Sequence, residues 1–124
     1  MGDNVLRGIR GAVTVEQNSP EDIHSATWEL LETIIKENNI NTEDIASIIF
    51  TLTQDLNAGF PALVARAKGF KYVPLLCATE INVPGSLARC IRILVHLNTS
   101  KSQQEIKHIY LKGAVKLRED LASD

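Results

Sequence analysis

The stretch of sequence that decides the fold lies near the start of the chain and reads Leu6-Arg7-Gly8-Ile9-Arg10-Gly11-Ala12-Val13-Thr14-Val15. It is interrupted by glycine at its start and β-branched at its end, which predicts a β-strand. Side chains alternate along a strand, so Arg10 shares one face with Leu6, Gly8, Ala12 and Thr14. A long cation among short neighbours leaves space above the sheet for a ligand or another subunit.

The next segment carries the start signal of a helix. Ser19 is suited to the N-cap, Pro20 to the first helical position, and Glu21 and Asp22 to the positive end of the helix dipole. A stripe with three- and four-residue spacing then continues to Asn38 or Asn39 and must pack on a sheet. Its members are Ile23, Thr27, Leu30, Leu31, Ile34 and Ile35.

The remaining elements follow from apolar runs and the glycine, proline and polar residues between them. Residues 45–53 predict a strand buried on both faces, after a loop or single turn at 42–44. A short apolar stripe that begins at Phe60 predicts a helix ending at Gly69, with Arg66 off the stripe. Further strands are expected at 71–78, 89–98 and 108–111, with a helical turn within 100–105.

This order, β-α-β-α-β-β-β, predicts an α+β fold in which a mixed β-sheet carries both helices on one face. No linker or repeat divides the chain, so residues 1–124 are expected to form a single domain. Two helices can cover only one side of the sheet. The other face is therefore expected to pack against further copies of the chain, most simply in a closed cyclic oligomer.

The composition excludes several classes of function. With 13 Lys and Arg against 15 Asp and Glu, and aromatic residues at 5%, the chain offers neither a basic surface nor stacking rings for a nucleic acid. No apolar run approaches the roughly 18 residues of a membrane span and no signal peptide is evident, so a cytoplasmic protein without membrane contact is expected. The cysteines and histidines show no metal-ligand spacing, so no metal site is expected.

Arginines stand at positions where a solvated lysine would be less costly. Arg10 and Arg92 lie inside strand patterns, Arg66 on a short helix and Arg118 near the end of the chain. Arginine's planar fork suits carboxylates. For any one strand arginine the simpler explanation is a structural salt bridge, here to Glu80 or Asp55. Two such arginines, together with Glu80 and Tyr110, favour a site for a small anion.

Other candidate side chains have simple structural explanations of their own. Cys77 and Glu80 come at the end of the third strand, where polar side chains commonly reach into a cleft. Cys77 is equally explained as a small buried hydrophobe, Glu80 as a surface acid, and Phe60, by its helix phase, as a core residue. The sequence has no glycine-rich phosphate loop and no Ser-His-Asp arrangement. An enzyme of this kind would work by positioning and electrostatics.

Five segments, taken in order, closely resemble the trimeric α/β class of chorismate mutases, as distinct from the all-helical class. They are residues 7–16, 53–62, 72–80, 90–92 and 108–118. The resemblance implies a ferredoxin-like or chorismate-mutase-like sheet, and a homotrimer in which three sheets form a pseudo-α/β barrel with active sites between subunits. It also implies the rearrangement of chorismate to prephenate, in aromatic amino acid biosynthesis, without a cofactor or metal.

The resemblance also implies a role for individual residues. Arg92 would meet the ether oxygen of chorismate, and Arg10 a carboxylate. Glu80 and Cys77 would meet the ring hydroxyl and the positive side of the transition state. The remaining substrate contacts would be Tyr110, Arg66, Phe60, Ala62, Leu76 through its backbone, Leu117, and Arg118 at the entrance. One departure is Leu63, where the family often has a lysine.

Two other functions are weighed against the mutase. The first is a different enzyme of similar architecture, such as the small trimeric imine deaminases, which also bind carboxylates with a strand arginine. The second is a non-catalytic trimer that binds a dicarboxylate and signals to a partner. Turnover of chorismate separates the mutase from both.

Overall fold

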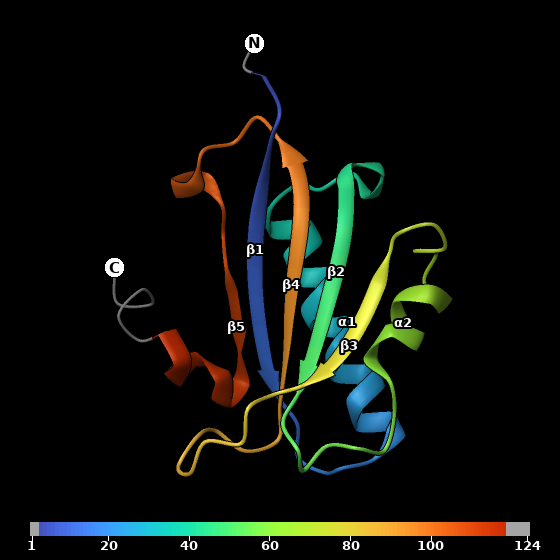
Figure 1. Cartoon of the computed structure of the whole chain (residues 1–124), viewed down its shortest axis with the longest axis vertical. Helices are drawn as coiled ribbons and strands as arrows, with labels where there is room; N and C mark the ends of the chain where they lie inside the picture. Colours follow the sequence, from blue (N-terminus) through green and yellow to red (C-terminus); the bar gives the residue numbers. More distant parts are fainter. Residues whose placement is uncertain (1–2, 119–124) are drawn as a thin grey trace.

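The computed structural model describes residues 3–118 and has the predicted order of elements (Figure 1). The strands and helices are β1 (Val5–Thr14), α1 (Pro20–Glu37), β2 (Ile45–Leu52), α2 (Pro61–Ala67), β3 (Leu75–Thr79), β4 (Cys90–Thr99) and β5 (Ile109–Leu111). Short 3₁₀ turns lie at η1 (Thr42–Asp44), η2 (Gln103–Glu105) and η3 (Lys112–Arg118). The turns predicted at 42–44 and within 100–105 are thus confirmed.

The sheet is mixed, as predicted, with the strand order β3-β2-β4-β1-β5. β4 lies antiparallel between β1 and β2, while the edge strands β5 and β3 run parallel to β1 and β2. The ferredoxin-like description is wrong, because that fold has the element order β-α-β-β-α-β and this chain places α2 before β3. In the observed strand order, β3 and β5 form the two opposite edges of the sheet.

Both helices cover the same face of the sheet, behind the strands in Figure 1. α1 begins as predicted: the Ser19 hydroxyl oxygen accepts a hydrogen bond from the Asp22 backbone N–H at 3.1 Å, and Pro20 opens the first turn. The core between helices and sheet is aliphatic, with Phe50 as its largest fully buried side chain. The predicted layer arrangement is confirmed.

Three details differ from the sequence-based expectations. β3 starts at Leu75 rather than Lys71, because the segment 71–74 is an irregular approach that ends in Pro74. β2 is buried on its helix face only: Ile48 is fully buried, whereas Ile49 and Thr51 on the other face are partly exposed. Phe60 is not a core residue. It caps α2 rather than entering its first turn, and it is 67% exposed.

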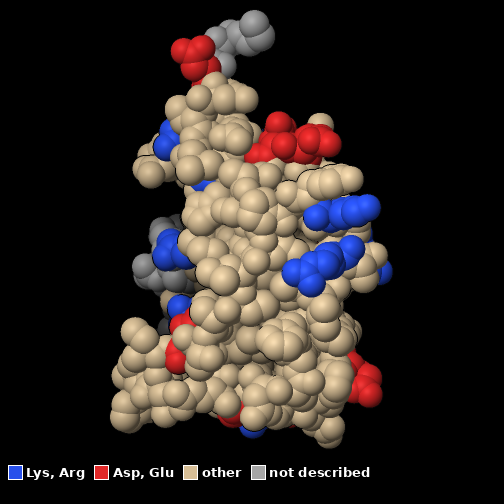
Figure 2. Space-filling view, turned by 45° about the vertical axis from the view of Figure 1, so that its right-hand side comes forward, with Lys and Arg blue, Asp and Glu red and all other residues tan. Residues whose placement is uncertain are grey.

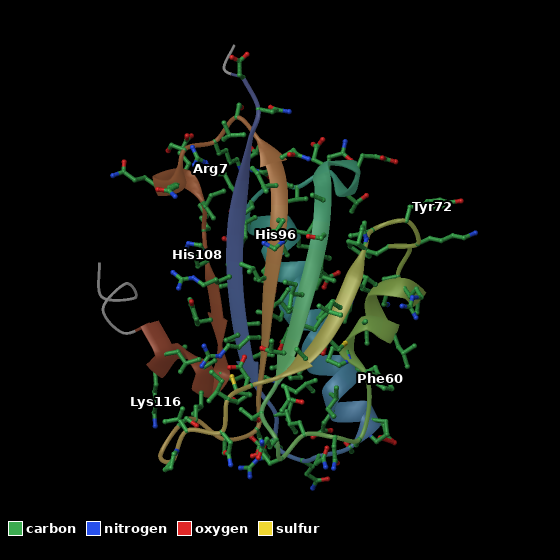
Figure 3. All side chains as sticks on the ribbon, in the orientation of Figure 1. Arg7, Phe60, Tyr72, His96, His108 and Lys116 are labelled. Carbon is green, nitrogen blue, oxygen red and sulfur yellow. The ribbon has the colours of Figure 1, made fainter. Side chains whose placement is uncertain are left out.

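The face of the sheet away from the helices is largely uncovered in the single chain. Figure 2 shows this side together with the β3 edge: its middle is uncharged, and the Lys and Arg side chains lie toward its two margins. His96 lies near the middle of the sheet (Figure 3), where the Ser47 hydroxyl and the imidazole Nδ1 are 2.9 Å apart. Within residues 3–118, η3 folds back toward this face, where Ala114 packs with Ala12 and Cys90, and Leu87 from the loop before β4 packs against the same cluster. Among residues 3–118, no helix is both long and apolar enough to cross a bilayer.

Candidate active site

A cavity of about 440 Å³ opens on the uncovered face of the sheet, within the range of small-molecule sites. Strands β1, β2, β4 and β5 form its floor, and η3 contributes a wall through Leu117. Its lining comprises Arg10, Gly11, Ala12, Ile49, Thr51, Glu80, Arg92, Ile93, Leu94, Tyr110 and Leu117. Five of the sequence-predicted residues, Arg10, Glu80, Arg92, Tyr110 and Leu117, thus meet in one place.

The strand register explains why these residues meet. Arg92 on β4 pairs with Ala12 on β1 and with Thr51 on β2, while Ala12 also pairs with Tyr110 on β5. Directly paired residues point to the same face of a sheet, so the four form one row across it. Ala12 is the smallest member of the row, and it leaves room between the side chains of Arg92 and Tyr110.

Arg92 forms an ion pair with Glu80, as the structural explanation of a strand arginine predicted. Its Nε lies 3.7 Å from Oε2 of Glu80, and both side chains are partly exposed. The Thr51 hydroxyl donates a hydrogen bond to the same carboxylate oxygen. Glu80 is further fixed by its backbone N–H, which donates to the Leu52 carbonyl at 2.8 Å. Two side-chain contacts, to Arg92 and Thr51, therefore place the carboxylate, and the backbone bond to β2 fixes the residue that carries it.

Cys90 lies beneath Arg92 on the same face of β4 and is only 1% exposed. Burial raises the pKa of the Cys90 thiol, and the nearby guanidinium of Arg92 opposes that effect without cancelling it. The thiol is therefore neutral at physiological pH and acts as packing under the arginine. A nucleophilic role would require the opposite shift of its pKa.

Arg10 and Tyr110 are brought together by contacts that the sequence did not reveal. The Arg10 backbone N–H donates to Nδ1 of His108, the residue before β5, at 2.9 Å. The amide of Asn38, 1% exposed at the end of α1, donates to the Lys107 carbonyl at 2.9 Å and accepts from the Lys107 N–H at 2.8 Å. Asn38 thereby ties α1 to the residues that lead into β5 and positions the strand that carries Tyr110.

Cys77 lies on the other face of the sheet from this cavity. It is the strand partner of the buried Phe50 on β2 and packs against the core, as expected of a small hydrophobic residue. It lines a second cavity of about 490 Å³ together with Phe60 and Leu63, at the edge formed by β3 and α2. In the single chain Cys77 and Glu80 thus line different cavities, because alternation along β3 turns Cys77 toward the helices.

The other predicted contact residues lie around this β3 edge. Leu76 is 61% exposed on β3, Arg66 is exposed on α2, and Ala62 is buried in the core. In Figure 3, Phe60 lies at the β3 side of the sheet and His108 at the β5 side. The side chain of Arg118 lies outside the described residues. The sequence-predicted residues thus fall into two groups, one around Arg92 and one at the β3 edge.

Thr51 is the polar side chain of the cavity lining that sequence reasoning missed. Its strand was predicted, but only the register between β2 and β4 shows that it is the direct neighbour of Arg92. A β-branched polar residue in an apolar strand was the available signal. Among residues 3–118, no group of three or more His, Cys, Asp or Glu side chains gathers closely enough to hold a metal ion.

Comparison with known proteins gives consistent matches over nearly the whole chain. The family model for chorismate mutase type I matches residues 6–121. A chorismate mutase AroH from Thermus thermophilus is 52% identical over 120 residues, which cover 96% of this chain and 98% of that protein. The corresponding protein from Bacillus subtilis is 44% identical, covering 95% and 94%. A solved chorismate mutase structure from Clostridium thermocellum superposes with a TM-score of 0.86 at 48% identity, covering 87% of this chain and 96% of that one.

Proposed function

The chain belongs to the type I chorismate mutase family, and we propose that its mutase reaction takes place in the cavity around Arg92. The observation that carries this proposal is the pairing of Arg92 with Glu80 on the floor of a cavity that also receives Arg10 and Tyr110. A small dianion requires cations at fixed positions, and this cavity contains two arginines on adjacent strands.

The reaction is a rearrangement within one molecule. The ether C–O bond of chorismate breaks as a C–C bond forms, so negative charge grows on the ether oxygen and the ring becomes partly positive. We assign Arg92 to the ether oxygen, because a preorganised cation there stabilises charge that exists only in the transition state. Glu80, held next to Arg92, has the sign of charge that stabilises the ring. No covalent intermediate is required.

The substrate must also be held in its compact, reactive conformer. We assign Arg10 and Tyr110 to its carboxylates, since fixing the side chain over the ring removes part of the entropic barrier. Leu117 forms an apolar wall of the same cavity. A side chain on β1 and another on β5 then hold one end of the substrate, while Arg92 meets its reacting centre.

The second group of predicted residues completes the site in a trimer. Phe60, Cys77, Leu76 through its backbone, Ala62 and Arg66 lie at or near the β3 edge, at the opposite side of the sheet from β5. In a head-to-tail ring each β3 edge would meet the open face of the next copy. We propose that three copies form such a ring, a pseudo-α/β barrel, with Arg118 near each entrance. The cytoplasmic location and the single domain over residues 1–124 stay predictions.

Loss of chorismate absorbance with the purified protein tests this function. We expect turnover by the wild-type chain, and a fall of at least about 100-fold in Arg92→Ala, as for removal of a preorganised oxyanion donor. Arg7→Ala is the matched control, because Arg7 donates to the Lys101 carbonyl and lies outside the cavity. A wild-type protein inactive on chorismate would contradict the proposal, as would an Arg92→Ala variant as active as the control.

A further inference from the structure

We propose that Thr51 is a positioning residue that keeps Glu80 on one edge of Arg92 and leaves the other edge of the guanidinium for the substrate. The inference rests on the proposed function, because it assigns Thr51 a role in the same cavity. It adds a residue to which neither the sequence patterns nor the family resemblance had given a task.

The geometry around Glu80 carries the argument. Glu80 is the first residue after β3, and the exposed loop of residues 81–86 follows it directly. Its carboxylate therefore depends on neighbouring side chains for a fixed position. One of these is Thr51, whose hydroxyl donates to Oε2. The other is Arg92, whose Nε lies 3.7 Å from the same oxygen.

The choice of guanidinium edge matters for catalysis. Arginine has five N–H donors, one on Nε and four on the two terminal nitrogens. A carboxylate free to turn prefers a two-pronged pairing that occupies two of these donors at once. Because Thr51 holds Oε2 next to Nε, such a pairing with the terminal nitrogens is disfavoured. Those nitrogens then remain available to an anionic oxygen in the cavity.

The register makes Thr51 the residue able to do this. It is the direct partner of Arg92 on β2, so its side chain stands beside the arginine on the same face. The partner on the other side is Ala12, which has no hydrogen-bonding group in its side chain. The Thr51 hydroxyl on β2 therefore holds the Glu80 carboxylate on the side of Arg92 that lies nearer to β3.

The experiment compares three threonine variants by steady-state kinetics on chorismate. Thr51→Val keeps the β-branched shape that suits a strand but removes the donor, and we expect kcat to fall about tenfold with little change in KM. Thr51→Ser keeps the hydroxyl and should stay within about threefold of wild type. Thr33→Val is the matched control, since it removes a hydroxyl that donates to the Glu29 carbonyl on α1.

A double-mutant cycle separates this role from simple support of the fold. If Thr51 acts through Glu80, Thr51→Val should cost nothing further in a Glu80→Gln background. The ¹⁵N-detected Nε–H signal of Arg92, assigned by its loss in Arg92→Lys, should also shift in Thr51→Val but not in Thr51→Ser. This signal does not depend on turnover.

The inference is overturned if Thr51→Val keeps the wild-type kcat, if its loss multiplies with that of Glu80→Gln, or if the Arg92 signal does not move. A serine variant as poor as the valine variant would also overturn it. A wild-type enzyme without activity on chorismate would instead refute the proposed function, and the Arg92 signal would then decide the Thr51 contact by itself.

Discussion

At the scale of single residues, the central feature is Arg92, which is held by neighbouring side chains and still lines the cavity. Arg92 packs above the neutral thiol of Cys90, stands between Ala12 and Thr51, and pairs with Glu80 at one edge of its guanidinium. These contacts restrict its rotamers before any ligand arrives. Preorganisation of this kind makes a cation effective toward charge that develops during a reaction.

Replacing Arg92 by lysine tests whether its shape matters in addition to its charge. Lysine retains the positive charge but has no planar fork, and it cannot pair with Glu80 and reach a ligand oxygen in the same geometry. We expect Arg92→Lys to lose at least about 100-fold in kcat on chorismate. Activity within a few-fold of wild type would show that charge alone suffices and would contradict the assigned role.

The two cysteines should differ in reactivity. Because burial raises the pKa of Cys90 above its ordinary value of 9.0, we expect iodoacetamide at pH 8 to modify Cys77 first and leave Cys90 intact. Mass spectrometry of the native protein checks this, with the protein in denaturant as control. Equal labelling of both thiols in the native protein would contradict the account.

The raised pKa of Cys90 also makes stability depend on pH. The folded state keeps the thiol proton that the unfolded chain loses above about pH 9, so the contribution of the neutral thiol to stability is complete below that pH and is lost above it.

At the scale of elements, Asn38 links the helix layer to the edge of the sheet. Its side chain makes hydrogen bonds to Ile34 within α1 and to both backbone groups of Lys107, and its own carbonyl accepts from the ammonium of Lys101. β5 is only three residues long and pairs with β1 alone, so it depends on such outside support. The position of Tyr110 follows from that support.

We expect Asn38→Ala to lower the free energy of unfolding by about 2 to 4 kcal/mol, because it removes a buried side chain and leaves the partly buried backbone groups of Lys107 without these partners. Urea denaturation measures the change. Asn39→Gly is the neighbouring control: Asn39 is exposed, and its φ of 50° suits glycine, so little change is expected. If both variants were equally stable, the linking role of Asn38 would be refuted.

The order of the elements could be predicted from local patterns, because helix starts such as Ser19-Pro20 and apolar periodicity act over a few residues. Strand register could not be predicted in this way, since it depends on pairing between residues far apart in the sequence. Arg92 was therefore recognised as a candidate, but its neighbour Thr51 was not. Phe60 was misread for a related reason: its exposure depends on where α2 begins, within one residue.

At the scale of the whole molecule, the uncovered sheet face is the dominant feature. Large apolar side chains on this side and at its edges remain exposed, among them Leu6, Leu76 and Val115. Large contiguous patches of exposed apolar surface mark interaction sites in soluble proteins. The residues proposed for one site are also divided between the open face and the β3 edge, which are apart in a single chain.

The proposed ring predicts a mass of three chains in solution. Light scattering coupled to size-exclusion chromatography should report about three times 13.7 kDa at micromolar concentration. A charge at the centre of the open face should weaken assembly, because it would have to be buried between copies. We expect Leu94→Glu to shift the population toward smaller species, whereas the exposed helix variant Glu32→Gln should not. A monomeric wild-type protein would contradict the ring.

Complementation between two impaired variants tests the central claim, a site around Arg92 that is shared between copies. Arg92→Ala removes the reacting cation, and Phe60→Asp places a charge that repels the dianion at the exposed β3 edge. Each variant alone should have little activity. Co-expressed at equal amounts, they should regain about one quarter of wild-type turnover, since that fraction of shared sites draws an intact half from each chain. Turnover no higher than the mean of the two separate variants would contradict the account.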